Sequence, residues 1–401
     1  MDSIKNIYKI GAGPSSSHTI GPSQAAALFR ARNPETLSFR VTLYGSLAAT
    51  GRGHMTDKAI SNALAPAAVE IVWRADIVPE YHTNGMLFEA LDGNGSVKDS
   101  WMVYSVGGGC LSEGPLKDMT IEKGCYPMDK MSDIQKYIAE EGLSFWEYVQ
   151  ECEKEDIWDF LAEIWQAMQD SVEAGLRDDS RLPGCLKLRS KAMQYYKRAD
   201  SIGASIKGRA YVSAYALAVS EQNARGGNVV TAPTCGSCGI VPSVLYHLKK
   251  SHGVPDDEIL KALATAGLFG NVIKVNASLS GAEVGCQGEV GSACVMAAVA
   301  ANQIFGGTCR QIEYSAEMAM EHNLGLTCDP ICGLVQIPCI ERNPMAALRA
   351  LDASMYALLG DGSHLISFDK VVDTMKRTGK DLPSLYKETA IGGLAAVDYK
   401  K

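Results

Sequence analysis

The chain has 401 residues, 46% of them hydrophobic, and its 46 acidic residues outnumber 38 basic ones. These numbers are typical of a soluble globular chain with room for two or three domains, and they exclude a disordered protein. The net charge of −8 argues against nucleic acid as a partner, because a phosphate backbone would be repelled.

A membrane partner is also not expected. The longest unbroken apolar run, Ala293 to Ala301, has nine residues, about half of what a bilayer-spanning helix needs. The first residues, MDSIKNIYKIG, lack the apolar core and cleavage site of a signal peptide. We therefore expect a cytoplasmic location.

Up to about residue 130, short β-rich runs alternate with helix-like and Gly-rich pieces. The β-rich runs contain many β-branched and aromatic residues and are mostly bounded by Gly, Pro or Asn. The predicted strands are Leu37 to Tyr44, Val69 to Trp73, Met86 to Ala90 and Trp101 to Val106. This pattern indicates a small α/β or α+β unit.

From Ser132 onward an apolar period of 3.6 residues replaces the strand pattern. One predicted helix face consists of Leu161, Ile164, Trp165, Met168 and Val172. Gly175 predicts the end of that helix, and the polar segment Arg177 to Gly184 is expected to join two subregions. Asn343 followed by Pro344 predicts the start of a later helix, as an N-cap and a proline at the first helical position.

The two patterns together predict an α+β chain with two domains. We expect a small N-terminal α/β domain over residues 1–130 and a larger, mostly α-helical domain over residues 131–401.

The first candidate site is the run GAGPSSSHTIGPSQAA, Gly11 to Ala26, in which Ser15, Ser16, Ser17 and His18 lie between two Gly-Pro turns. Hydroxyls and backbone amides in such a run can hold a carboxylate. The alternative is that the serines and threonine cap a helix beginning near Pro22, with His18 on the surface.

A second candidate is the Gly-rich segment that follows the predicted strand ending at Tyr44. It places His54 beside Thr56 and Asp57. Histidine titrates near neutral pH, so His54 is a candidate general base. A mobile surface loop is the alternative interpretation.

Cysteines are concentrated in the second half of the chain. Twelve are present, and eight lie between residues 235 and 339: Cys235, Cys238, Cys286, Cys294, Cys309, Cys328, Cys332 and Cys339. Metal or redox chemistry is one explanation, and packing of small buried thiols is the other. The Cys235-x-x-Cys238 pair has no second close pair or His partners that would complete a zinc site, so it is a weak signal.

Five segments resemble the iron-sulfur-dependent L-serine dehydratases, also called L-serine ammonia-lyases. They are GPSSSHTIGP, LYGSLAATGRGHMTDKA, TAPTCGSCGIVPSVL, SGAEVGCQGEVGSACVMAA and HNLGLTCDPICGLVQIPCIERN. The resemblance covers nearly the whole chain, with the segments in the family's order. It implies a small α/β domain fused to a helical domain.

The resemblance also implies the chemistry. Cys286, Cys328 and Cys339 would hold a 4Fe-4S cluster whose fourth iron lacks a protein thiolate and acts as a Lewis acid on the serine hydroxyl. His54 is the first choice for the base that removes the Cα proton, and His18 is the second. Substrate contacts are expected from the following side chains: Ser15, Ser16, Ser17, Thr56 and Asp57.

Cys235 departs from the family, which more usually has Asn there. Packing, contact with substrate and cluster ligation are the three roles that we weigh for this thiol, and we select it as a candidate substrate contact.

The predicted function is therefore dehydration and deamination of L-serine to pyruvate and ammonia, without pyridoxal phosphate, in amino-acid catabolism and gluconeogenesis. The rivals are a related 4Fe-4S lyase acting on L-threonine or L-cysteine, and a non-catalytic cysteine-rich metal-binding or redox protein. We expect a small amino-acid substrate and a homodimer.

Overall fold

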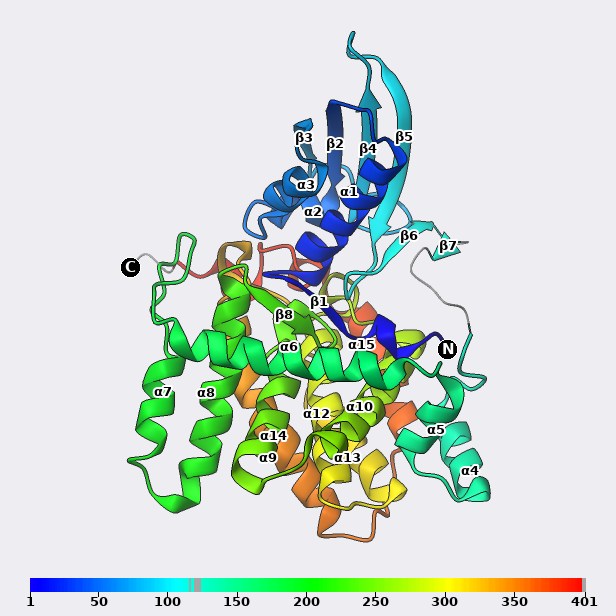
Figure 1. The fold of residues 1–401 in the computed structure, drawn as a ribbon, viewed down its shortest axis with the longest axis vertical. Helices are drawn as coiled ribbons and strands as arrows, with labels where there is room; N and C mark the ends of the chain where they lie inside the picture. Colours follow the sequence, from blue (N-terminus) through cyan, green and yellow to red (C-terminus); the bar gives the residue numbers. More distant parts are fainter. Residues whose placement is uncertain (115–116, 119–123, 399–401) are drawn as a thin grey trace.

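In the computed structural model, which describes residues 1–114, 117–118 and 124–398, a part built on a β-sheet stands at one end of a larger helical part (Figure 1). The sheet has the strand order β3-β2-β4-β5-β6-β7. Its strands are β2 (Ser38–Tyr44), β3 (Ala68–Arg74), β4 (Gly85–Leu91), β5 (Val97–Ser105), β6 (Leu111–Gly114) and β7 (Lys117–Asp118). All four predicted strands are confirmed.

Only one strand pair of this sheet is parallel. β2 and β3 run parallel, with Thr42 opposite Val72, and the remaining neighbours are antiparallel, with Val41 opposite Phe88. Buried residues alternate along β2, as a strand with one covered face requires. The mixed sheet therefore has a distinct inner face.

Helices α1 (Gly21–Arg32) and α3 (Thr56–Leu64) contribute to the core on that inner face, and the short α2 (Gly45–Thr50) follows β2. The core contains four aromatic side chains, Phe29, Phe39, Phe88 and Trp101. Phe29 lies against each of the other three, with ring centroids 5.6 to 6.2 Å apart. This part thus has a hydrophobic core of its own.

The N-terminus packs with the helical part and not with the sheet. β1 (Lys9–Ala12) pairs antiparallel with β8 (Asn228–Thr231), with Ile10 opposite Val230. Ile4, Ile7 and Tyr8 are buried in the larger core. The division at residue 130 stays a prediction. The first twelve residues precede this boundary in the sequence but pack with the helices that follow it.

Twelve α-helices make up most of the described remainder: α4 (Met131–Glu141), α5 (Phe145–Cys152), α6 (Ile157–Arg177), α7 (Ala192–Ala199), α8 (Ala204–Ala224), α9 (Ile240–His252), α10 (Asp256–Asn276), α11 (Gly281–Val284), α12 (Ser292–Ile304), α13 (Cys309–Glu321), α14 (Cys339–Leu358) and α15 (Phe368–Asp381). α12 carries the apolar run and is buried from Ser292 to Asn302 among its neighbours (Figure 1). No helix in the described ranges is both long and apolar enough to cross a bilayer.

α6 confirms the predicted helix face and corrects its end. The five face residues from Leu161 to Val172 are all buried. Gly175 does not end the helix, which continues to Arg177. A Cβ at Gly175 would clash with the carbonyl oxygen of Ala218 in α8. The glycine is thus explained by close packing of α6 against α8, and the predicted connection begins directly after α6.

α14 corrects a second prediction, since it begins at Cys339 and contains Pro344 in its interior. Asn343 is not its N-cap. The buried Asn343 side chain accepts a hydrogen bond from the backbone N–H of Gly239 (2.8 Å) and donates to the carbonyls of Gly236 and Cys339. Tertiary hydrogen bonds therefore explain an asparagine that resembles a cap in the sequence.

Candidate active site

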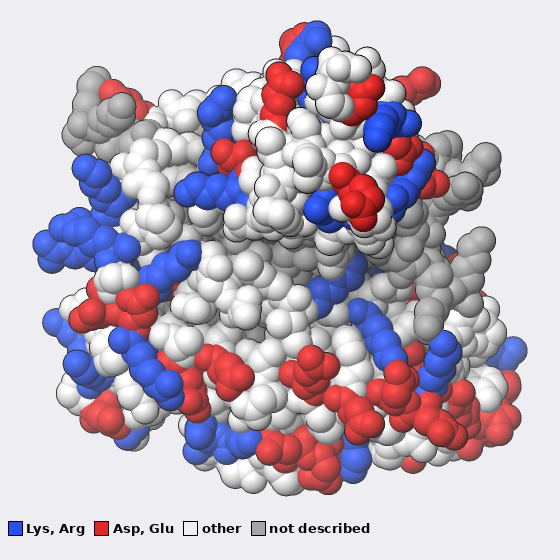
Figure 2. Space-filling model, turned by 45° about the horizontal axis from the view of Figure 1, so that its top comes forward, with Lys and Arg blue, Asp and Glu red and all other residues white. Residues whose placement is uncertain are grey.

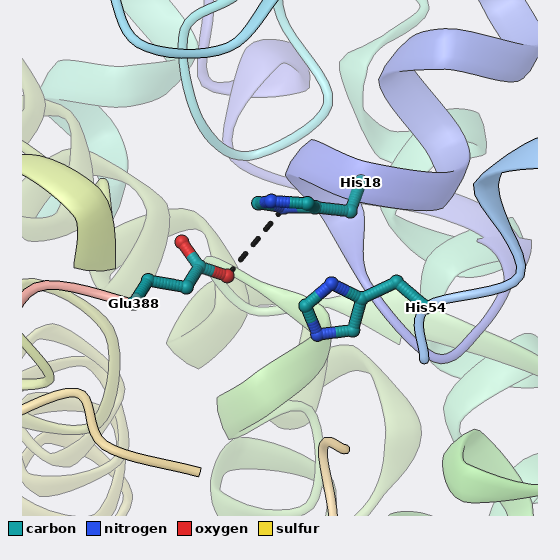
Figure 3. Close-up of side chains that lie close together, drawn as sticks. All are labelled: His18, His54 and Glu388. Carbon is teal, nitrogen blue, oxygen red and sulfur yellow. Dashed lines mark ion pairs between the residues drawn. The ribbon is translucent and has the colours of Figure 1, made fainter. Parts of the chain in front are cut away.

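The predicted site residues gather where the sheet part meets the helical part. Two histidines come from the sheet part, His18 from a π-helical turn, Ser16–Ile20, and His54 from the turn that joins α2 to α3. The three cysteines come from the helical part. Glu388, near the C-terminal end of the described chain, approaches His18 (Figure 3).

The serine run both caps a turn and surrounds a buried histidine. Ser15 Oγ accepts a hydrogen bond from the backbone N–H of His18 (3.1 Å) and so caps the turn Ser16–Ile20, whereas the helix that begins at Gly21 has no side-chain cap, contrary to the capping alternative. His18 is also fully buried, so its predicted surface position is wrong. Ser17 Oγ lies 2.9 Å from His18 Nδ1. Ser15, Ser16 and Ser17 are all buried around it.

The turn that carries His54 is also buried and fixed. Thr19 Oγ1 donates to the His54 carbonyl (2.8 Å), and Thr56 Oγ1 donates to the His18 carbonyl. The loop interpretation of His54 as a mobile surface residue is therefore wrong. Asp57 is half-buried in the first turn of α3 and makes no side-chain hydrogen bond or ion pair with any described residue.

His18, His54 and Glu388 form a compact polar cluster. The histidine ring centroids are 4.5 Å apart at an interplanar angle of 62°, and His18 Nδ1 lies 3.5 Å from Glu388 Oε1. Figure 3 shows the carboxylate approaching the edge of the His18 ring, with the His54 ring beside both. This is the only group of three His, Cys, Asp or Glu residues within the described chain whose ligand atoms all lie within 4.8 Å of one another.

Ser46 determines which nitrogen of His18 carries a proton. Its hydroxyl donates to the Glu388 carbonyl (3.2 Å), so its oxygen accepts from His18 Nε2 at 3.2 Å. Neutral His18 therefore has its lone pair on Nδ1, facing Ser17 and Glu388. With both nitrogens engaged, His18 fits acid–base chemistry better than metal ligation.

His54 differs because neither of its ring nitrogens has a hydrogen-bond partner among the described residues. The side chain is fully buried. A buried polar atom without a partner costs free energy, so such an atom indicates a missing ligand or water. The lone pair of His54 is thus available to a molecule bound at this interface.

Burial shifts the pKa values of the two histidines and of Glu388 in opposite directions. It lowers the pKa of His54 to about 4. It also lowers the pKa of His18 well below its ordinary value, with the charges of His54 and His82 acting in the same direction. Burial raises the pKa of Glu388 to about 8, and Cys286 adds to that rise. At neutral pH both histidines are neutral while Glu388 holds its proton.

Cys286, Cys328 and Cys339 come together from three segments. Cys286 precedes a π-helical turn, Gln287–Gly291; Cys328 forms an isolated bridge with Lys387; and Cys339 begins α14. A hydrogen bond from the Cys328 thiol lowers the pKa of Cys286 to about 6. The same bond raises the pKa of Cys328, and burial raises that of Cys339.

A buried cation and a carboxylate accompany these thiols. Arg342 is hydrogen-bonded to Cys286, and its guanidinium also donates to the Thr327 carbonyl (2.6 Å). The Cys328 thiol donates to Glu289 Oε2 at 3.7 Å. Burial raises the pKa of Glu289 well above its ordinary value.

The arrangement of the thiols fits a multi-iron cluster. The three thiols do not all lie within 4.8 Å of one another, so they are not gathered around a single ion in the described chain. Gly281 lines the same space, since a Cβ there would lie 3.1 Å from Cys328 Sγ and 2.7 Å from Glu289 Oε2. Thiolates are the ligands that iron-sulfur clusters use, so the donor set of three cysteines fits such a cluster.

Cys235 and Cys238 lie buried near this space without joining the three thiols. Burial raises the pKa of Cys235 well above its ordinary value, with Cys238 and Glu289 acting in the same direction. A Cβ at the neighbouring Gly236 would lie 3.2 Å from Glu289 Oε1. Cys235 therefore borders the site at the Glu289 carboxylate.

Several residues of the site were not selected from the sequence. Glu289 and Arg342 lie inside segments that carried the resemblance, so their charges amid cysteines were an available signal. Ser46 likewise lies in the Gly-rich segment before His54. Glu388 lies outside all of those segments, and nothing in its local sequence points to His18.

Both regions of the chain match models of known protein families. Residues 91–395 match the family model described as serine dehydratase alpha chain, and residues 3–77 match the one described as serine dehydratase beta chain. The chain is 43% identical to an L-serine dehydratase of Streptomyces coelicolor, covering 98% of both chains. It is 40% identical to an L-serine dehydratase of Haemophilus influenzae, covering 98% of this chain and 99% of that one, and 39% identical to L-serine dehydratase 2 of Escherichia coli, covering 98% of both.

Proposed function

The chain belongs to the serine dehydratase family, with beta-chain and alpha-chain regions in one polypeptide, and we propose that it is a lyase that converts L-serine into pyruvate and ammonia. The proposal rests on one observation. The thiols of Cys286, Cys328 and Cys339 lie at the same buried interface as the cluster of His18, His54 and Glu388. The relatives named L-serine dehydratase support the choice of substrate.

The proposed cofactor is a 4Fe-4S cluster held by Cys286, Cys328 and Cys339. When bound, such a cluster supplies one iron without a protein thiolate, which acts as a Lewis acid toward an oxygen of the substrate. The chain contributes a buried space, the hydrogen bond from Arg342 to Cys286, and the room beside Cys328 and Glu289 that a Cβ at Gly281 would occupy.

His54 is the proposed base for the Cα proton. It is neutral at pH values above about 4, and both of its nitrogens lack a partner in the described chain. The hydrogen bond from Thr19 to the His54 carbonyl fixes the turn from which the ring projects. A fixed, neutral imidazole with a free lone pair is suited to accept a proton.

His18 and Glu388 are the proposed proton donor pair. Glu388 holds a proton at neutral pH because burial raises its pKa to about 8. His18 keeps its place through Ser17 and Ser46. An elimination requires a deprotonated base beside a protonated acid, and neutral His54 beside protonated Glu388 is such a pair.

The proton balance of the reaction then follows. His54 takes the Cα proton, and the β-hydroxyl leaves as water with a proton from the Glu388 side of the cluster. The product, aminoacrylate, tautomerises to an imine, which water hydrolyses to pyruvate and ammonia. Ser15, Ser16, Ser17, Thr56, Asp57 and Cys235 remain the proposed substrate contacts.

The deciding experiment is an anaerobic assay of pyruvate release from L-serine, with and without added pyridoxal phosphate. We expect pyruvate in both cases at the same rate, with iron and sulfide bound. L-threonine, whose product would be 2-oxobutanoate, and L-cysteine, whose products would be pyruvate, ammonia and hydrogen sulfide, serve as alternative substrates, and faster release of the 2-oxo acid from either would replace L-serine in the proposal. Zinc without sulfide and no product would favour the metal-binding scaffold.

The cytoplasmic location, the homodimer and the part in gluconeogenesis stay predictions. Lys and Arg side chains are interspersed with Asp and Glu on the face shown in Figure 2. A surface of mixed charge on that face fits the expectation that a small molecule, and not nucleic acid, is the partner.

A further inference from the structure

A cavity of about 240 Å³ lies between the sheet part and the helical part. Its wall includes His82 from the loop before β4, Gly107 and Gly108 from the turn between β5 and β6, Lys274 from α10 and Glu283 from α11. Its size suits a small molecule. None of these residues belongs to the proposed reaction centre.

The turn between β5 and β6 contributes Gly107 and Gly108 to the cavity wall, and their backbone amides have no acceptor in the described ranges. Gly107, Gly108 and Gly109 have φ values of 102°, 58° and 78°, a conformation that glycine adopts without strain. All three residues are buried, and their N–H groups donate to no acceptor in the described ranges. Successive amides in a turn of this kind form a concavity that binds anions. Buried amides without partners point to a ligand.

His82 adds a side-chain donor. Its Nδ1 accepts the backbone N–H of Asn84 (3.1 Å), so neutral His82 carries its proton on Nε2. That Nε2 makes no hydrogen bond within the described chain and lies 3.6 Å from Glu283 Oε1, which is beyond hydrogen-bond distance. The residue is only 7% exposed.

Three other buried polar atoms without partners belong to residues that neighbour the glycine turn, although none of these residues lines the cavity. Asn84 Oδ1, Ser105 Oγ and Ser280 Oγ make no hydrogen bond to any described residue. Ser105 precedes the glycine turn by two residues, and a Cβ at Gly107 would lie 3.3 Å from Ser280 Cβ.

Opposite charges complete the wall. Lys274 is half-buried and makes no ion pair with a described residue, so its ammonium group is available to a carboxylate. Glu283 offers a carboxylate, of which Oε2 accepts from Ser278 and Oε1 remains toward His82. One cation with several N–H donors and one anion match a zwitterion.

The cavity adjoins the proposed reaction centre through a thin wall. Ser280 contacts Gly107 on the cavity side, and the next residue, Gly281, lies beside Cys328 and Glu289. The charge of His82 also lowers the pKa of His18. A molecule in the cavity would therefore be a neighbour of both the thiols and the histidines.

We propose that this cavity binds the two charged groups of an α-amino acid. The carboxylate is held by the amides of Gly107 and Gly108, by His82 Nε2–H and by Lys274, and the ammonium group is held by Glu283. This inference rests on the proposed function for the identity of the amino acid as the substrate. It adds an entry and recognition site that depends only on groups common to all α-amino acids.

The test uses calorimetric binding of L-alanine, which lacks the leaving hydroxyl, to the cluster-loaded enzyme. Lys274→Met and Glu283→Gln should each raise the Kd for L-alanine and the KM for L-serine about tenfold or more. The kcat should stay within about threefold, because neither residue touches the reacting atoms. Lys376→Met and Glu140→Gln, on exposed residues of α15 and α4, are the matched controls.

Propionate separates the two halves of the site, since it has a carboxylate and no ammonium group. Its binding should weaken in Lys274→Met and stay unchanged in Glu283→Gln. Unchanged Kd and KM in both variants, with iron and sulfide at the parent level, would overturn the site. That result would leave the proposed function standing. Binding that follows this pattern without pyruvate from L-serine would instead overturn the function and keep the site.

Discussion

The backbone of Cys328 holds the segment that carries Glu388. Cys328 N–H donates to the Tyr386 carbonyl (2.8 Å), and Glu388 N–H donates to the Cys328 carbonyl (2.7 Å). The Glu388 side chain then reaches to 3.5 Å from His18 Nδ1. A proposed cluster ligand is thus joined by one backbone hydrogen bond to Glu388 and by a second one to Tyr386 of the same segment, so the two halves of the site are positioned together.

Glu388→Gln should test the proton donor assigned to this segment. The amide keeps the shape and the backbone hydrogen bonds but cannot supply an acidic proton. We expect iron and sulfide contents equal to those of the parent and a kcat lower by roughly 10²-fold, the scale of general acid catalysis. Lys387→Gln, on the neighbouring residue, is the control and should retain the parent rate. A kcat unchanged in Glu388→Gln would remove Glu388 from the mechanism.

His54→Ala should separate the base from the cluster. Because neither His54 nitrogen is bonded to a described residue, its loss breaks no hydrogen bond in the fold. We expect the visible cluster absorption to persist while kcat falls by roughly 10²- to 10⁴-fold. Loss of the absorption would make His54 structural, and a normal rate would move the base to His18.

Serine substitutions should divide the cysteines into ligands and packing residues. Anaerobic protein should contain roughly four irons and four sulfides per chain. Cys286→Ser, Cys328→Ser and Cys339→Ser should each lose the cluster. Cys294→Ser should keep it, because the thiol donates to the Ala346 carbonyl (3.4 Å), which a hydroxyl can also do. Equal iron loss in Cys294→Ser and Cys286→Ser would refute the ligand set.

Gly281→Ala should report on the space beside the thiols. The added methyl would lie 2.7 Å from Glu289 Oε2 and 3.1 Å from Cys328 Sγ, so one of them must move. Overpacking of this kind costs about 1–3 kcal/mol and should lower the iron retained per chain. Gly93→Ala meets nothing within 4 Å and is the matched control. Equal iron contents in the two variants would show that the space is larger than the structure indicates.

The pH dependence of stability should expose a buried histidine outside the site. Burial lowers the pKa of His247 to about 4, against an ordinary value of 6.5. The unfolded chain therefore binds a proton that the folded chain excludes between these values, and the free energy of unfolding falls as the pH decreases from 6.5 toward 4. The slope should be up to about 1.4 kcal/mol per pH unit for this group.

Urea titrations at several pH values within that window measure this slope. His247→Gln should show a shallower dependence than the parent, whatever its absolute stability, and should keep the serine rate because His247 lies in α9, away from the proposed site. A slope equal to that of the parent would mean that His247 takes up its proton without loss of the fold.

The sequence by itself determined the local elements. Alternating and 3.6-residue apolar patterns predicted four strands and the buried face of α6, because those patterns follow directly from backbone geometry. The spacing of Gly, Pro and Cys did not identify a site until the resemblance supplied one. Local signals also misled at Gly175 and Asn343, where helix packing and buried hydrogen bonds override the residue's usual preference.

The tertiary structure alone decided which distant groups meet. Ser46 and Glu388 are hydrogen-bonded although 342 residues separate them. No local preference encodes such a contact, since it depends on how the sheet part packs against the helical part. The same arrangement leaves His54 without a hydrogen-bond partner among the described residues and places Gly107 and Gly108 in one cavity wall with Lys274. Burial and neighbouring charge, which set the pKa values of His54 and Glu388, arise only when those segments come together.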